Sequence, residues 1–137
     1  MAVDYGDRHI GIALSDPTGM ITGRAWTVDE WNFERAASRV ADIANEEKAD
    51  RLILGCPKNM DGSVGPRAEK SMAFAELLKQ SYSGEIVLWD ERRTTVDAHR
   101  ILTDAGKHGK KRKETVDAVA ASLILEGYLG FMANGRR

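Results

Sequence analysis

The feature that most constrains the fold is the change of hydrophobic period near Asn32. Before Asn32, short apolar and β-branched runs predict three strands, over residues 2–5, 10–14 and 20–28. After it, apolar side chains recur at helical spacing and Asn32 is placed to act as the N-cap. The helical stripe consists of Phe33, Ala36, Ala37, Val40, Ala41 and Ala44. Three successive strands before the first helix predict an antiparallel meander.

From residue 51 onward, strand and helix patterns alternate. Leu52-Ile53-Leu54 is a continuous apolar run, typical of a strand buried on both faces. The full order, β-β-β-α-β-α-β-α-α, predicts an α/β fold with a mixed five-stranded sheet and helices on both faces. We expect one domain over residues 1–137. The later predicted elements are a strand at 51–56, a loop at 57–65, a helix from Pro66 ended by Gly84, a strand at 85–89, a helix at 94–105 ended by Gly106, and a helix from about 114 to about 129.

Composition excludes several classes of protein. With 42% hydrophobic residues and a net charge of −1, the chain is neither disordered nor strongly basic. The single cysteine, Cys56, excludes a disulfide scaffold and suits a reducing compartment. The first residues do not resemble a signal peptide. The most apolar stretch, 118–133, contains Glu126 and two glycines, so we expect no membrane span and a cytoplasmic protein.

The near-neutral net charge hides a segregation of charge. Residues 1–50 hold ten acidic and five basic side chains, whereas residues 91–137 hold six acidic and ten basic ones. Five of these cations lie in residues 107–113, which contain no acid. Such a run is either a solvated segment or a loop that contacts the phosphates of a nucleic acid.

Three acids fall where this architecture can bring them together. Asp4 ends the first strand, Glu91 follows the fifth, and Asp117 lies in the first turns of the last helix. Asp4 and Glu91 become neighbours if their strands end at the same edge with the fourth strand beside them. Three close carboxylates repel one another unless they share a divalent cation, and oxygen ligands suit Mg²⁺ or Mn²⁺. Such a site suits phosphodiester hydrolysis.

Each acid also has a simpler explanation. Asp4 can be interpreted as a turn residue before Gly6, and Glu91 as a surface acid beside arginines. Asp117 is favourable near a helix N-terminus because of the helix dipole. Likewise Trp26, Trp31 and Trp89 are interpreted as core or rim residues rather than base-stacking platforms. From the residue pattern alone these alternatives stay open.

More specific motifs then appear in order along the chain. They are Asp4-Tyr5-Gly6, Ile10-Gly11-Ile12-Ala13, the segment from Gly55 to Ser63, Trp89-Asp90-Glu91-Arg92 with Thr94-Thr95, and the basic run before Val116-Asp117-Ala118. Together they resemble the YqgF family, also called RuvX-like or Holliday-junction-resolvase-like proteins, over nearly the whole chain. The resemblance implies a ribonuclease H-like fold and a nuclease that matures the 5′ end of precursor 16S ribosomal RNA. Asp4, Glu91 and Asp117 match the three acidic positions of the family's metal site.

The resemblance and the charge pattern also suggest substrate contacts. The loop at 57–65 feeds a helix N-terminus, whose amides suit a phosphate. The expected substrate-binding residues are Lys58, Asn59, Arg92, Thr95, Lys110, Lys111, Arg112 and Lys113. The expected partners are precursor rRNA, branched or single-stranded DNA, and ribosomal particles, bound by a monomer or homodimer.

Three other functions remain as alternatives. The first is a DNA junction resolvase, which needs two active sites and hence a twofold dimer. The second is a nucleotide-binding ATPase module, suggested by Asp4-x-Gly6 followed by Gly11. The third is a ribosome-assembly protein without catalytic activity.

Overall fold

A computed structural model of the chain describes residues 1–19, 21–91 and 109–135. The described strands form one five-stranded sheet in the order β3-β2-β1-β4-β5. β1 is antiparallel to β2 and parallel to β4, and β4 is parallel to β5. The mixed five-stranded sheet is therefore confirmed. The elements are β1 (Ala2–Asp4), β2 (His9–Ser15), β3 (Thr22–Asp29), α1 (Phe33–Glu46), β4 (Arg51–Cys56), α2 (Pro66–Leu78), β5 (Glu85–Asp90) and α4 (Gly109–Gly135).

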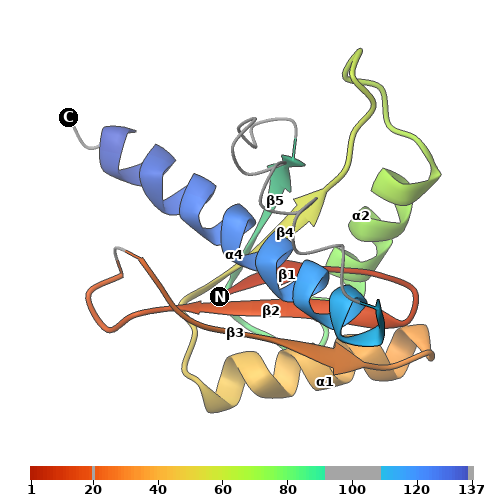
Figure 1. Cartoon of the computed structure of the whole chain (residues 1–137), viewed down its shortest axis with the longest axis horizontal. Coiled ribbons are helices and arrows are strands. Elements are labelled where there is room, and N and C mark those ends of the chain that lie inside the picture. Colours follow the sequence, from red (N-terminus) through yellow and green to blue (C-terminus); the bar gives the residue numbers. More distant parts are fainter. Residues whose placement is uncertain (20, 92–108, 136–137) are drawn as a thin grey trace.

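Helices cover both faces of the sheet, as predicted. α1 and α2 pack on one face, where Val40, Phe74 and Leu78 meet Ile10 and other sheet residues in the larger core. α4 crosses the opposite face, and its residues pack on the sheet in a second, smaller core (Figure 1). The predicted helix at 94–105 lies outside the described residues.

Local sequence signals account for the start of two helices. The side chain of Asn32 accepts a hydrogen bond of 2.9 Å from the backbone nitrogen of Arg35, which confirms its role as N-cap of α1. α2 begins at Pro66, as predicted, because a proline at the first helical position lacks only an N–H that would have no helical partner. α1 buries the predicted small and apolar side chains Ala36, Ala37, Val40, Ala41 and Ala44.

The predicted end of α2 at Gly84 is wrong. The helix ends at Leu78, and a turn then brings the buried Tyr82 back against the core. The Tyr82 hydroxyl donates a hydrogen bond of 2.6 Å to the Ala49 carbonyl oxygen. A Cβ at Gly84 would lie 2.1 Å from the Tyr82 hydroxyl oxygen. Gly84 therefore makes room for this tyrosine and does not cap the helix.

The last helix is longer than predicted. α4 begins at Gly109 rather than near Glu114, so the backbone of residues 110–113 is helical and not part of a loop. Lysine and arginine favour helices, which explains the earlier start. By length and composition Val116–Asn134 is apolar enough to cross a membrane, contrary to our expectation for this stretch. In this structure its inner side packs on the sheet as a core helix, burying Ala121, Ile124, Leu125 and Tyr128.

Candidate active site

The parallel strands bring two of the predicted acids to one end of the sheet. β4 lies between β1 and β5 and runs parallel to both. Asp4 is the last residue of β1, and Glu91 directly follows the last residue of β5. Both side chains are partly buried. The predicted site required the fourth strand to lie between the first and the fifth, and the structure has this arrangement.

Gly11 brings the third acid to the same place. Gly11 pairs with Asp4 across the β1–β2 ladder. A Cβ at Gly11 would lie 2.0 Å from the carbonyl oxygen of Asp117, which is shorter than any non-bonded contact allows. The backbone of α4 therefore touches β2 at this glycine, and Asp117 is placed directly over the strand that pairs with Asp4.

Gly55 makes the corresponding space for Glu91. It lies in β4 and pairs with Trp89 of β5. A Cβ at Gly55 would lie 2.6 Å from Cδ1 of Ile124 and 3.0 Å from Oε1 of Glu91. The absence of a side chain at Gly55 thus admits both the α4 side chain and the carboxylate. Two glycines, on the strands that flank β1, determine how closely the acids approach.

The electrostatics agree with this convergence. Burial, together with the negative charges of Glu91 and Asp117, raises the pKa of Asp4 to about 8, against the opposing effect of Arg67. Burial also raises the pKa of Glu91, with Asp90 adding to the increase and Arg67 opposing it. The carboxylates of Glu91 and Asp117 therefore lie close enough to Asp4 to disfavour its ionisation.

The donor set fits a hard divalent cation in its chemistry. Carboxylate oxygens are the ligands that Mg²⁺ and Mn²⁺ prefer, and a cation would relieve the repulsion that raises the pKa of Asp4. Among the residues that the structure describes, no three His, Cys, Asp or Glu side chains are arranged as a ready metal site. A bound cation would therefore have to draw the carboxylates closer together.

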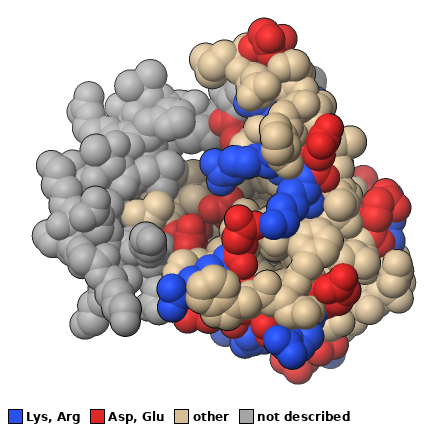
Figure 2. All heavy atoms as spheres, turned by 90° about the vertical axis from the view of Figure 1, so that its right-hand side faces the viewer, with Lys and Arg blue, Asp and Glu red and all other residues tan. Residues whose placement is uncertain are grey.

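A basic pocket lies beside the carboxylates. It has a volume of about 240 Å³ and is lined by Tyr5, Gly6, Asp7, Pro57, Pro66, Arg67, Lys70 and Ser71. Lys70 forms an ion pair with Asp7, and its ammonium lies 5.8 Å from the centre of the Tyr5 ring. Figure 2 shows this end of the molecule, where acidic and basic side chains gather around a hollow.

Two cations of this pocket, Arg67 and Lys70, were not indicated by the sequence pattern, and Arg67 is the one that acts on the acids. Arg67 lies in the first turn of α2 and acts electrostatically on both Asp4 and Glu91. A cation in the first turn of a helix opposes the helix dipole. That unfavourable placement, directly after a glycine-rich loop, is the sequence signal that would have pointed to it.

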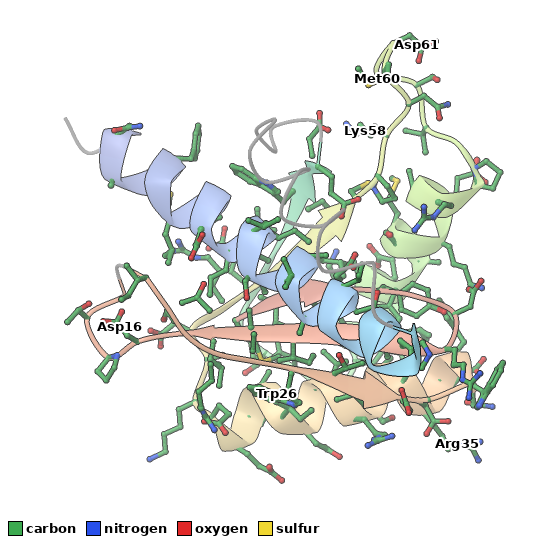
Figure 3. All side chains as sticks on the ribbon, in the orientation of Figure 1. Asp16, Trp26, Arg35, Lys58, Met60 and Asp61 are labelled. Atoms are coloured by element: carbon green, nitrogen blue, oxygen red, sulfur yellow. The ribbon has the colours of Figure 1, made fainter. Side chains whose placement is uncertain are left out.

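The loop between β4 and α2 holds its own shape. Asn59 donates from Nδ2 to the Ser63 hydroxyl at 2.9 Å, and Asp61 accepts hydrogen bonds from the Ser63 backbone and hydroxyl. Gly62 has a φ of +88°, so the interpretation of Asp61-Gly62 as turn chemistry is confirmed. Asn59 thus has a structural role in the loop. Met60 and Asp61 lie at the tip, and Lys58 lies nearer the sheet (Figure 3).

The other predicted substrate contacts are less fully described. Arg92 and Thr95 lie outside the described residues. For Lys110, Lys111, Arg112 and Lys113 the structure describes the backbone, which forms the first turns of α4.

Cys56 is a core residue, as predicted. It is buried at the end of β4, and burial raises the pKa of its thiol. A nucleophilic cysteine needs the opposite shift, because the thiolate is the reactive form.

Comparison with solved structures supports the fold. The RuvC protein of Thermus thermophilus in complex with a Holliday junction substrate superposes with a TM-score of 0.59, over 94% of this chain and 92% of that one. A further Thermus thermophilus RuvC structure gives a TM-score of 0.55, over 95% of this chain and 94% of that one. Sequence identity is 11% in both cases, so the likeness concerns the fold. The predicted ribonuclease H-like fold is confirmed.

Comparison with sequences identifies the family. A protein of Clostridium tetani is 42% identical over 98% of this chain and 97% of its own length, and one of Halothermothrix orenii is 43% identical over 96% and 94%. Both carry the name "Putative pre-16S rRNA nuclease". The family model described as "RuvX: Holliday junction resolvase" matches residues 1–130. The chain therefore belongs to the RuvX family.

Proposed function

We propose that this protein is a divalent-metal-dependent nuclease that hydrolyses phosphodiester bonds during 5′-end maturation of precursor 16S rRNA in the cytoplasm. The observation that carries the proposal is the convergence of Asp4, Glu91 and Asp117 at one end of the sheet, in a chain of the RuvX family. The names of its relatives support the rRNA substrate.

In this proposal the three carboxylates hold Mg²⁺ or Mn²⁺ at the end of β1 and β5. A divalent cation held by these carboxylates would lower the pKa of an attacking water and neutralise charge on the phosphate. Arg67 and Lys70 line the neighbouring pocket and would attract a phosphate of the strand. Gly11 lets the Asp117 backbone approach β2, and Gly55 leaves room for the Glu91 carboxylate.

The test is cleavage of labelled precursor rRNA 5′ ends by wild type and by Asp117→Asn, with Mn²⁺, with Mg²⁺ and with chelator. We expect cleavage by wild type only when metal is present, and loss of cleavage in Asp117→Asn with an unchanged circular dichroism spectrum. Glu126→Gln, on an exposed part of the same helix, is the matched control and should cleave as wild type does. Full activity of Asp117→Asn would refute the assignment.

The second candidate is a Holliday junction resolvase, which the description of the family model favours. Symmetric cuts in a four-way junction require two active sites related by a twofold axis. Junction DNA is therefore included beside the rRNA substrate, and the oligomeric state is measured by sedimentation at the assay concentration. A monomer that cuts rRNA ends and leaves junctions intact would exclude the resolvase.

A further inference from the structure

Trp31 is an exposed aromatic residue just after the end of β3. It lies between β3 and α1, and 70% of its surface is exposed. The guanidinium of Arg8 stacks over its ring at 4.7 Å from the ring centre. The exposure excludes a core position for Trp31, whereas Trp89 is buried and Trp26 packs partly against the core. A single exposed apolar side chain needs no explanation by itself, and the feature that distinguishes Trp31 is the arginine stacked on its ring.

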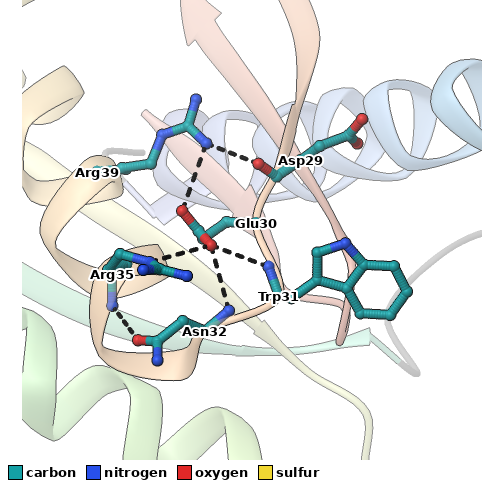
Figure 4. A network of polar contacts seen from close by, with 6 residues as sticks. All are labelled: Asp29, Glu30, Trp31, Asn32, Arg35 and Arg39. Carbon is teal, nitrogen blue, oxygen red and sulfur yellow. Dashed lines mark hydrogen bonds and ion pairs between the residues drawn. The ribbon is translucent and has the colours of Figure 1, made fainter.

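A polar network keeps the backbone on both sides of Trp31 in place. The Glu30 carboxylate accepts hydrogen bonds from the backbone nitrogens of Trp31 at 3.1 Å and Asn32 at 3.2 Å. Arg35 and Arg39 pair with the same carboxylate. These contacts, above all with the Asn32 amide, hold the pKa of Glu30 below its usual value. Figure 4 shows the indole pointing away from this network.

The same network connects Trp31 to its stacking partner. The backbone nitrogen of Glu30 donates to the Arg8 carbonyl oxygen at 2.9 Å. The ring and the guanidinium are therefore supported by segments that are hydrogen-bonded to each other. Because these hydrogen bonds already hold the backbone of Trp31 and Arg8 in place, a planar ligand that stacks here would not have to order these segments first.

Trp31 lies at the end of the sheet that carries the acids. Asp29, which ends β3, pairs with His9 at the start of β2. His9 precedes Gly11, where the Asp117 backbone contacts β2, by two residues. Two residues of a strand span about 7 Å. Trp31 follows Asp29 by two residues. A strand of nucleic acid that lies across the carboxylates and continues past the start of β2 would therefore run toward the indole.

The charges around Trp31 favour a polyanion. Arg8 stacks on the ring, and Arg35 and Arg39 have side chains that are 71% and 49% exposed. Of the two adjacent acids, Glu30 is only 14% exposed and already interacts with both arginines, and Asp29 is 55% exposed and pairs with His9. Stacking on an aromatic ring and an arginine is how proteins hold unpaired bases, whereas a duplex keeps its bases stacked internally.

We propose that Trp31 and Arg8 form a stacking platform for an unpaired base of the substrate strand, at the end of the sheet that carries the acids and beyond the start of β2. This inference relies on the proposed nuclease function to identify the bound strand as RNA. It adds that the RNA flanking the cut is single-stranded rather than part of a continuous duplex.

The test measures binding of a labelled single-stranded RNA and of the same sequence as a duplex, by fluorescence anisotropy in EDTA so that nothing is cleaved. We expect Trp31→Ala to weaken single-strand binding about tenfold and to leave duplex binding unchanged. Trp31→Phe should retain most of the affinity. Phe131→Ala is the control, because Phe131 is a half-exposed aromatic near the C-terminal end of α4, far along the helix from Asp117.

The outcomes separate the platform from the nuclease. The platform is overturned if Trp31→Ala binds the single strand as tightly as wild type does. It is also overturned if Trp31→Ala loses as much affinity for the duplex as for the single strand. If wild type cleaves no substrate and yet Trp31→Ala loses single-strand binding, the platform stands and the nuclease proposal fails. If cleavage is confirmed, Trp31→Ala should raise KM and leave kcat unchanged, whereas an unchanged KM would count against the platform alone.

Discussion

Gly11 is the residue on which the distance between α4 and the sheet depends. It pairs with Asp4 across the β1–β2 ladder and contacts the Asp117 carbonyl oxygen of α4. A single glycine is therefore in contact with the backbone of both acids. An added methyl group at this position meets backbone rather than a flexible side chain, so the helix itself has to move. The geometry of the candidate site is therefore sensitive to a residue that carries no functional group.

We predict that Gly11→Ala lowers the free energy of unfolding by about 3 kcal/mol and removes metal-dependent cleavage. Gly130→Ala, in the helix that Gly11 contacts, is the matched control, because a Cβ there meets no atom within 4 Å. It should raise stability by about 0.5–1 kcal/mol through helix propensity. Urea denaturation checks both values, and a Gly11→Ala protein as stable and active as wild type would contradict the proposed contact.

The sequence predicted the three acids of the candidate site but not Arg67. Asp4, Glu91 and Asp117 follow from their positions at strand ends and in a helix, together with the resemblance to a family. Arg67 and the exposure of Trp31 did not follow, because exposure and charge environment depend on segments distant in the chain. That the three acids act as metal ligands stays a prediction.

Among the elements, α4 extends beyond expectation at both ends, and its start bears on the candidate site. The first turns of α4 contain four consecutive basic residues, Lys110, Lys111, Arg112 and Lys113. The helix dipole disfavours positive charge at this end of a helix. A bound phosphate backbone would offset this unfavourable placement. Since the same helix carries Asp117, phosphate contacts at its start would position the strand relative to the acids.

We predict that replacing Lys110, Lys111, Arg112 and Lys113 by Gln weakens RNA binding and reduces its dependence on salt. For a single strand, the slope of log K against log salt should fall by about 0.7 for each phosphate that is no longer neutralised. The Gln variant should also be slightly more stable, because the dipole conflict is removed. Lys79→Gln, at the C-terminal end of α2, is the control, and equal salt slopes for both variants would argue against phosphate contacts at α4.

At the scale of the whole molecule, charge is segregated although the net charge is −1. The basic run, the pocket with Arg67 and Lys70, and the arginines around Trp31 all belong to elements that border the acidic end of the sheet. Net charge is therefore a poor guide to nucleic-acid binding in this chain. The description of residues 1–137 as a single domain stays a prediction.

The buried carboxylates also predict how global stability depends on pH. The pKa of Asp4 is about 8 in the folded protein, above its ordinary value near 3.8, so the folded state binds the extra proton. Without metal, the stability of wild type should therefore fall as pH rises from about 4 to about 8, relative to Asp4→Asn. Above pH 8 we expect the variant to be more stable by at least about 1 kcal/mol.

Denaturation in EDTA across this pH range measures the difference. Saturating Mn²⁺ should stabilise wild type more than Asp4→Asn and so reverse their order above pH 8. Parallel stability curves for the two proteins in EDTA would contradict the raised pKa.

The sequence by itself determined the order of the described elements, the N-cap of α1, the start of α2 and the candidate acids. These depend on hydrophobic period, capping residues and motifs that are local along the chain. Only the tertiary structure decided that α4 touches Gly11, that α2 ends before Tyr82, that Arg67 acts on the carboxylates and that Trp31 is exposed. The physical reason is that such close approaches depend on packing between residues far apart in sequence, which no local pattern contains.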